Sequence, residues 1–140
     1  MLNLDSTIKY KNAISIDSTL SEAYYRLGKR TAITSTAQGH EYYSKAIQYN
    51  ENFVDAMFAK GNLYYNNYQN NNDIQMGIDL YLKAIQIEPH ATDLRINCAL
   101  AYYSIGKSEL ALKMARSILR IDSFHRKASA LIDEINGGVA

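Results

Sequence analysis

The stretch GIDLYLKAIQIEP, from Gly77 to Pro89, decides the fold because other segments repeat it almost position for position. The closest copies are TIKYKNAISIDST (Thr7 to Thr19) and HEYYSKAIQYNEN (His40 to Asn52), and a weaker one begins at Ala111. Aligned on Ala13, Ala46, Ala84 and Ile118, the copies lie 33, 38 and 34 residues apart. A period in this range is typical of arrays of helical repeats.

A second recurring segment alternates with the first. Its copies are AYYRLGKRT (Ala23 to Thr31), AMFAKGNLY (Ala56 to Tyr64) and LRINCALAY (Leu94 to Tyr102), and they keep the same offsets. Matched positions fall three, four and seven residues apart, which places them on one face of a helix and excludes a strand. The sequence therefore predicts an all-α chain, in which the small residues Gly28, Gly61 and Ala99 allow paired helices to approach closely.

We expect eight helices, at about 5–17, 20–33, 36–50, 53–66, 72–87, 91–105, 108–121 and 124–136. The first corresponds to the second helix of a pair, so it is either cut from a longer array or an end cap. We favour the cut, because a natural cap exposes a polar outer face. The last helix is either a cap or the beginning of another pair. Pro89 should end its helix, and Asp17-Ser18 and Asp122-Ser123 should cap the helices that follow them.

These positions resemble the tetratricopeptide repeat (TPR) pattern, which is Trp, Leu-Gly and Tyr on a first helix and Ala, a large aromatic and Pro on a second. The best copy here is Tyr24, Leu27-Gly28 and Thr31, followed by Gly39, Tyr43 and Ala46. The chain departs from the pattern in having no Trp and one Pro. The resemblance implies one domain over 1–140, a right-handed superhelix (α-solenoid) of antiparallel helix hairpins. Its parts are a truncated repeat (1–19), three repeats (20–52, 53–90 and 91–123) and a C-terminal capping helix (124–140).

The segment YNNYQNNND, from Tyr65 to Asp73, contains the residues that lengthen the second repeat. Because Asn favours turns, we expect a longer loop over 66–73 between paired helices. This loop is either a tolerated surface insertion or a partner-specific contact with Tyr68 at its tip.

Composition excludes several classes of protein. The 140 residues carry a formal net charge of +1, which provides no basic excess for nucleic acid, and no apolar stretch is long enough to span a membrane. The single cysteine, Cys98, excludes an internal disulfide. The compartment is unknown: cytoplasm is the default, although the chain could be a fragment that lacks an upstream signal.

No pattern of catalytic or metal-binding residues is present in the sequence. His40, His90 and His125 are far apart and fall near predicted helix starts, so we expect them at the surface or in turns. Cys98 takes a position where the repeat usually has Leu and should be a small buried hydrophobe. The glycines are scattered and form no phosphate-binding loop. We therefore expect no enzyme, no metal and no cofactor.

The first helix of each repeat carries a second stripe of residues. This stripe is rotated about 100° around the helix axis from the residues that face the paired helix. In the resembling family this flank lines the inner groove, where peptides or partner helices bind. An alternative is that Tyr25, Phe58 and Ile96 only pack repeat against repeat. The resemblance implies a groove of aromatic and amide side chains, formed by Tyr25, Lys29, Phe58, Asn62, Tyr65, Asn66, Asn97 and Tyr103.

Some family members clamp the carboxylate of a chaperone tail with two Asn, two Lys and one Arg. Asn62, Asn97 and Lys127 match these positions, but Phe58 and Leu131 replace two of the cations. Because charge-assisted bonds supply most of the strength of such recognition, we do not expect this clamp here.

The sequence thus favours a non-catalytic scaffold that binds a peptide or partner protein, with self-association as a further possibility. Two alternatives stay open. An RNA-binding repeat of the pentatricopeptide type has a similar period but usually a basic excess. The chain could also be a structural segment of a larger assembly.

Overall fold

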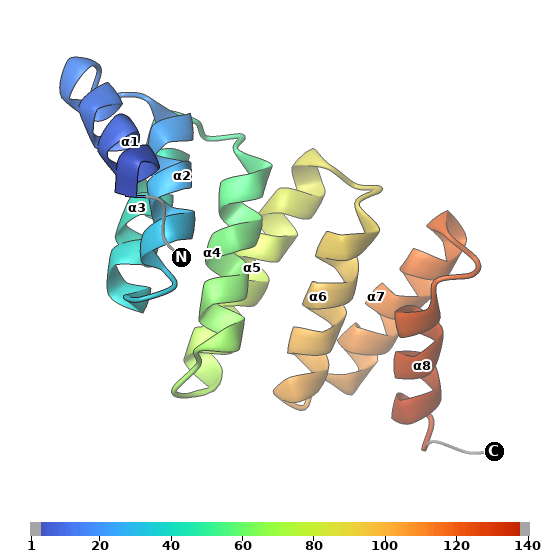
Figure 1. Cartoon of the computed structure of the whole chain (residues 1–140). Coiled ribbons are helices and arrows are strands. Elements are labelled where there is room, and N and C mark those ends of the chain that lie inside the picture. Colours follow the sequence, from blue (N-terminus) through green and yellow to red (C-terminus); the bar gives the residue numbers. More distant parts are fainter. Residues whose placement is uncertain (1–3, 138–140) are drawn as a thin grey trace. The chain divides into compact units, whose positions relative to one another are not determined.

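The structure, a computed structural model, describes residues 4–137, with side chains from residue 6 onward. It contains only helices and turns in this range (Figure 1). The helices are α1 (Leu4–Ile16), α2 (Ser21–Thr31), α3 (Thr36–Tyr49), α4 (Val54–Asn66), α5 (Asn71–Ile87), α6 (Thr92–Ser104), α7 (Ser108–Ile121) and α8 (Arg126–Ile135). Each lies within two residues of a range expected from the repeat, so the all-α prediction is confirmed.

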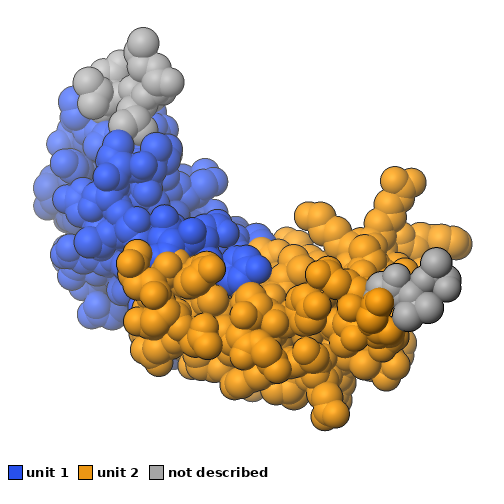
Figure 2. All heavy atoms as spheres, turned by 90° about the horizontal axis from the view of Figure 1, so that it is seen from below, with its two compact units in different colours: residues 1–67 blue, residues 68–140 orange. Residues whose placement is uncertain are grey.

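The helices form two compact units, residues 1–67 and 68–140 (Figure 2). In the first unit α1 packs on α2, α2 on α3 and α3 on α4. In the second unit α5 packs on α6, α6 on α7 and α7 on α8. Each unit thus has the same plan. One complete hairpin, α2–α3 or α6–α7, is preceded by a helix of the kind that ends a repeat, α1 or α5. It is followed by a helix of the kind that begins a repeat, α4 or α8.

The same backbone turn recurs after α1, α3, α5 and α7, the helices that end the repeats. The N–H groups of Asp17, Asn50, Glu88 and Asp122 donate to the carbonyls of Ala13, Ala46, Ala84 and Ile118, at 2.8 to 3.0 Å. Each acceptor carbonyl belongs to the residue on which the repeats were aligned, four residues before the N–H donor. The aligned position therefore supplies the acceptor of the last backbone hydrogen bond of the helix. Pro89 follows Glu88 and ends α5 as expected, since α5 stops at Ile87.

The expected capping by aspartates is wrong in detail. Asp17 Oδ1 accepts the Thr19 N–H at 2.9 Å and Asp122 Oδ1 accepts the Phe124 N–H at 3.1 Å, so both side chains close the turn rather than cap the next helix. The residue before α2 is Leu20, which makes no side-chain cap, and His125 caps α8 through the Ala128 N–H. The short Asx side chain reaches the amide two residues on before it reaches the helix.

The core of the first unit depends on a close approach of α2 and α3. Gly28 and Tyr43 are both buried, and a Cβ built on Gly28 would lie 2.6 Å from the Tyr43 ring. Tyr24 stacks on Tyr49 with 5.7 Å between ring centroids, and its hydroxyl donates to the Ser18 carbonyl. The predicted role of Gly28 at the helix contact is therefore confirmed.

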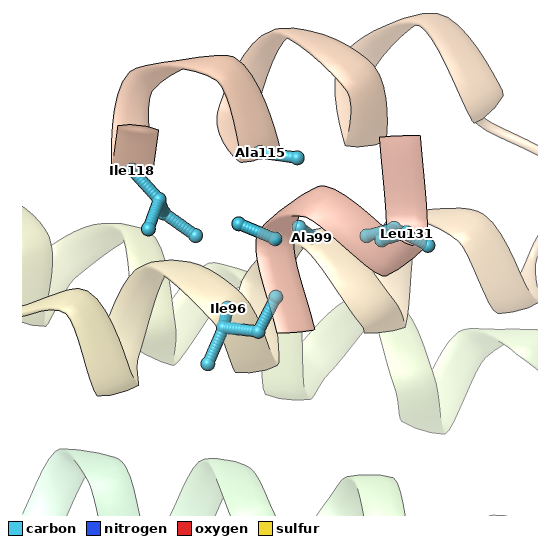
Figure 3. Close-up of a cluster of buried hydrophobic side chains, with 6 residues drawn as sticks. Ile96, Ala99, Ala115, Ile118 and Leu131 are labelled. Carbon is cyan, nitrogen blue, oxygen red and sulfur yellow. The ribbon is translucent and has the colours of Figure 1, made fainter. Parts of the chain in front are cut away.

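One part of the core of the second unit is a cluster of aliphatic side chains from three helices (Figure 3). Ile96 and Ala99 of α6 contact α7 and α8 residues that are almost fully buried. Ala99 takes the position of Gly28 in the repeat, and it is fully buried here. The α7 and α8 members of the cluster are Ala115, Ile118, Ala128 and Leu131.

The Asn-rich segment does not form the long loop that we expected. Residues 67–70 connect α4 to α5, which matches the length of the 32–35 connection between α2 and α3. The extra residues are helical instead: α4 has 13 residues against 11 in α2, and α5 has 17 against 14 in α3. Asn70 caps α5 by accepting the Asp73 N–H, so the helix begins inside the segment.

Of four predictions about single side chains, three are confirmed and one is wrong. Cys98 is fully buried, and burial raises the pKa of its thiol to about 12. His90 lies exposed in the turn after α5 and His125 lies at the start of α8. His40, in contrast, is half-buried within α3, where its ring stacks on Tyr64 at 4.1 Å between centroids. The contact with Tyr64, an aromatic residue of α4, shields part of the His40 ring from solvent.

Candidate functional site

The predicted groove residues of the first unit come from two helices, α2 and α4. On α4 they follow a spacing of four, three and one residues, which keeps them on one side of the helix. Asn66 is exposed, and the other three are half-buried: Phe58, Asn62 and Tyr65. Half-buried aromatic and amide side chains can offer both apolar surface and hydrogen bonds to a partner.

Tyr25 of α2 is held in place by neighbouring rings. Its centroid lies 6.1 Å from that of Tyr43 and 5.1 Å from that of Phe53, which directly precedes α4. The Lys29 ammonium lies 5.5 Å from the Tyr25 ring centroid, within the range of a cation–π contact. Burial, with a smaller contribution from Asp55, raises the pKa of the Tyr25 hydroxyl. Tyr25 of α2 therefore packs near one ring of α3 and one ring at the start of α4, while Lys29 is exposed.

The predicted groove residues of the second unit, Asn97 and Tyr103, lie on α6 and are both half-buried. Tyr103 packs against the aliphatic cluster together with Leu100. The eight predicted residues are thus divided, with six in the first unit and two in the second.

A pocket of about 250 Å³ lies between α6 and α8 in the second unit. Its apolar wall is Leu100, Ala130 and Leu131, and its polar ends are Lys127 and Glu134. Lys127 and Glu134 are seven residues apart, two turns along the same side of α8. The pocket is smaller than the roughly 300–1,000 Å³ typical of small-molecule sites, so its size suits one or two side chains of a larger ligand.

Sequence reasoning named Lys127 and Leu131, as positions of the clamp, but missed Ala130 and Glu134. The signal was available, because Ala130 and Glu134 lie 34 residues after Ile96 and Leu100. The predicted groove list nevertheless contains no residue of the last helix.

The carboxylate clamp gains no support from the residues that replace its cations. Leu131 is 3% exposed and belongs to the aliphatic cluster, so its position contributes to the core. Phe58 is half-buried on α4. Among the positions of the clamp in the second unit, Lys127 is the exposed cation.

Among residues 4–137, no three His, Cys, Asp or Glu side chains lie together in a way that could hold a metal ion. In the same part of the chain, no helix combines the length and the apolar composition that crossing a bilayer requires. The buried thiol of Cys98 has a pKa of about 12, which keeps it protonated and poorly nucleophilic at neutral pH.

No protein-family model matches the sequence. The structure is similar to that of MamA, with a TM-score of 0.83 and 20% identity, over 94% of this chain and 75% of MamA. It is similar to the first TPR domain of Spaghetti (RPAP3) bound to the HSP90 peptide SRMEEVD, with a TM-score of 0.75, 13% identity, and 87% and 94% of the two chains covered.

A third similar structure is the TPR domain of Arabidopsis OM64, with a TM-score of 0.72 and 13% identity, over 85% of this chain and 96% of that domain. These identities are low, so the similarity concerns the fold. It agrees with the alternating helices, the period and the Leu-Gly and Ala positions found in the sequence. The chain has the tetratricopeptide repeat fold, an α-solenoid of helix hairpins.

Proposed function

We propose that the chain is a non-catalytic interaction module that binds an extended segment of a partner protein. The observation that carries this proposal is the pocket between α6 and α8, which combines an apolar wall with one cation and one anion. An extended peptide presents side chains and backbone groups of both polarities along its length. Its binding requires a few apolar anchors and polar groups at defined positions, as this pocket provides.

The pocket suggests what the bound segment looks like. A small or medium apolar side chain would contact Leu100 and Ala130, with an acceptor facing Lys127 and a donor facing Glu134. The half-buried stripe on α4, formed by Phe58, Asn62 and Tyr65, supplies a second surface of aromatic and amide groups. Similarity to a TPR domain solved with a bound peptide adds support for this class of ligand.

The proposal is tested by selecting binding peptides from a displayed library and measuring their affinity for variants of the pocket. Ala130→Arg places a long charged side chain in the pocket and should weaken the selected peptides at least about tenfold. Ser129→Arg adds the same charge at an exposed neighbouring position outside the pocket and should leave affinity unchanged. Equal binding to both variants, or a library that yields no binding peptide, would contradict the proposal.

A different class of function, RNA binding, predicts the opposite result in a simple assay. The proposal expects no retention of single-stranded RNA on a filter at low salt, because basic and acidic residues nearly balance at 15 and 14. Tight, salt-sensitive retention would favour the RNA-binding alternative.

A further inference from the structure

The second unit has two adjoining hollows on α6 and α7, away from the α6–α8 pocket. One, of about 240 Å³, lies between the two helices, and the other, of about 460 Å³, lies along α7. Lys113 and Arg120 line both hollows. On α6 the hollow is lined by Arg95 and Tyr102, which lie five residues before and two after Leu100 and hence on the opposite side of the helix.

Basic side chains dominate the rim of these hollows. Arg95, Lys113, Arg116 and Arg120 line them, against one acid, Glu109. Within the described part of the chain, the carboxylates lie beyond ion-pair distance of Lys113, Arg116 and Arg120. Unpaired cations that converge on a concave surface produce a positive potential that favours an anionic ligand.

Arg95 is fixed in position before any ligand binds. Its Nε donates to the Pro89 carbonyl at 2.7 Å and its Nη1 donates to Ser117 Oγ at 2.8 Å. Nη1 also lies 3.7 Å from the Met114 sulfur. A guanidinium has more N–H donors than these contacts use, and its planar shape matches a carboxylate. Holding it in one orientation lowers the entropy lost on binding.

The floor of the hollow between the helices is apolar. Tyr102 and Met114 form it, and Leu110, which is 45% exposed, stands at its edge. A simple inorganic anion would leave this surface in contact with water. A peptide with an acidic residue beside an apolar one would use both the rim and the floor.

We infer that the hollows on α6 and α7 form a second binding site, distinct from the α6–α8 pocket, for an acidic segment of a partner protein that carries a large apolar side chain. The site goes beyond the proposed function, because it adds a surface on the other side of α6. One partner segment could occupy it while a different segment occupies the pocket.

The test measures the affinity of the labelled peptide GELEELEG by fluorescence anisotropy at low and at physiological salt. We expect binding that weakens with salt, and little binding of the matched peptide GQLQQLQG, which has the same apolar residues without the charge. The double variant Lys113→Gln/Arg120→Gln should weaken GELEELEG about fivefold or more. The double variant Lys83→Gln/Arg126→Gln removes the same charge from exposed positions outside the hollows and should bind as the wild type does.

The inference would be overturned by equal binding of the two peptides, by unchanged binding to the Lys113/Arg120 variant, or by displacement of the peptide by phosphatidylserine vesicles at lower concentration than by unlabelled peptide. The last would assign the basic surface to lipid. The Ala130→Arg variant separates this inference from the proposed function. If it retains GELEELEG binding, the inference is supported, and if it abolishes that binding, the peptide occupies the pocket and the second site is wrong.

Discussion

Gly28 shows how one missing Cβ sets the distance between two helices. A glycine inside a helix costs about 1 kcal/mol relative to alanine, so its presence in α2 needs a compensating contact. That contact is the Tyr43 ring, whose carbons would lie 2.6 Å from a Cβ on Gly28. Tyr43 is 4% exposed and has little room to move away. The glycine therefore trades helix propensity for close packing of α2 on α3.

We predict that Gly28→Ala lowers the free energy of unfolding by up to about 2 kcal/mol, because a steric cost of about 1–3 kcal/mol is offset by a gain in helix propensity of about 1 kcal/mol. Urea denaturation followed by circular dichroism measures the change. The control is the same substitution in a Tyr43→Leu background, where the smaller side chain should make alanine neutral or stabilising. An equal loss in both backgrounds would show that the Tyr43 contact is not the cause.

Asp17 illustrates a second residue-scale device, the closure of the turn between repeats. Its carboxylate accepts hydrogen bonds from the side-chain hydroxyl and the backbone N–H of Thr19, and these lower the pKa of the Asp17 carboxyl. Asn50 makes the corresponding bond to the Asn52 N–H. Where Pro89 fixes the backbone, Glu88 takes the position of Asp17.

We predict a pH dependence of stability from Asp17 with a defined sign. Because its folded pKa lies below its unfolded value of about 4, the stabilisation is fully present above pH 4 and is lost as the pH falls through the folded pKa. Comparing Asp17→Asn with the wild type by urea denaturation between pH 7 and pH 2 should show the wild type losing more stability. Asn keeps an acceptor oxygen for the turn, as Asn50 does, so it isolates the charge. Parallel pH profiles would contradict the assignment.

At the scale of elements, the repeat period was enough to predict all eight helices of residues 4–137. Each helix carries its own copy of the apolar pattern, so local sequence contains the information. The Asn-rich segment was wrongly predicted as a long loop because Asn favours both turns and helix starts. Asn70 accepts the Asp73 N–H at 3.1 Å, and Asp73 in turn accepts the Gln69 N–H at 2.8 Å. These two hydrogen bonds start α5 inside the Asn-rich segment, so the inserted residues become helical.

We predict that Asn70→Ala lowers the free energy of unfolding by about 1 kcal/mol, because the Asp73 N–H loses its acceptor. Asn72→Ala is the matched control, since Asn72 is exposed inside the first turn of α5 and alanine is the better helix former. Urea denaturation followed by circular dichroism should show a lower free energy of unfolding for Asn70→Ala than for the wild type. The free energy of unfolding of Asn72→Ala should equal or exceed that of the wild type. The reverse order would indicate that the segment is a loop in solution.

At the scale of the whole molecule, the repeat builds two units with the same order of helix types. The stripe on α4 was predictable because it follows a single helix, whereas the α6–α8 pocket and the basic hollows require side chains from different helices. Arg95 and Ser117 are 22 residues apart, and only the packing of α6 on α7 brings them to 2.8 Å. Periodicity in one sequence identifies which face a residue occupies, but it does not identify the cavities that form between faces.

The most direct test of the central claim, that these helix hairpins bind a partner segment beside α6 and α8, is a heteronuclear NMR titration. A peptide selected by display is added to the isotope-labelled chain, and perturbed backbone amides are mapped. We predict the largest chemical-shift perturbations at the backbone amides of Leu100, Lys127, Ala130 and Glu134. The amide chemical shifts of the core residues should stay unchanged, which would show that the helices keep their fold. Perturbations confined to other surfaces, with these four amides unaffected, would contradict the claim.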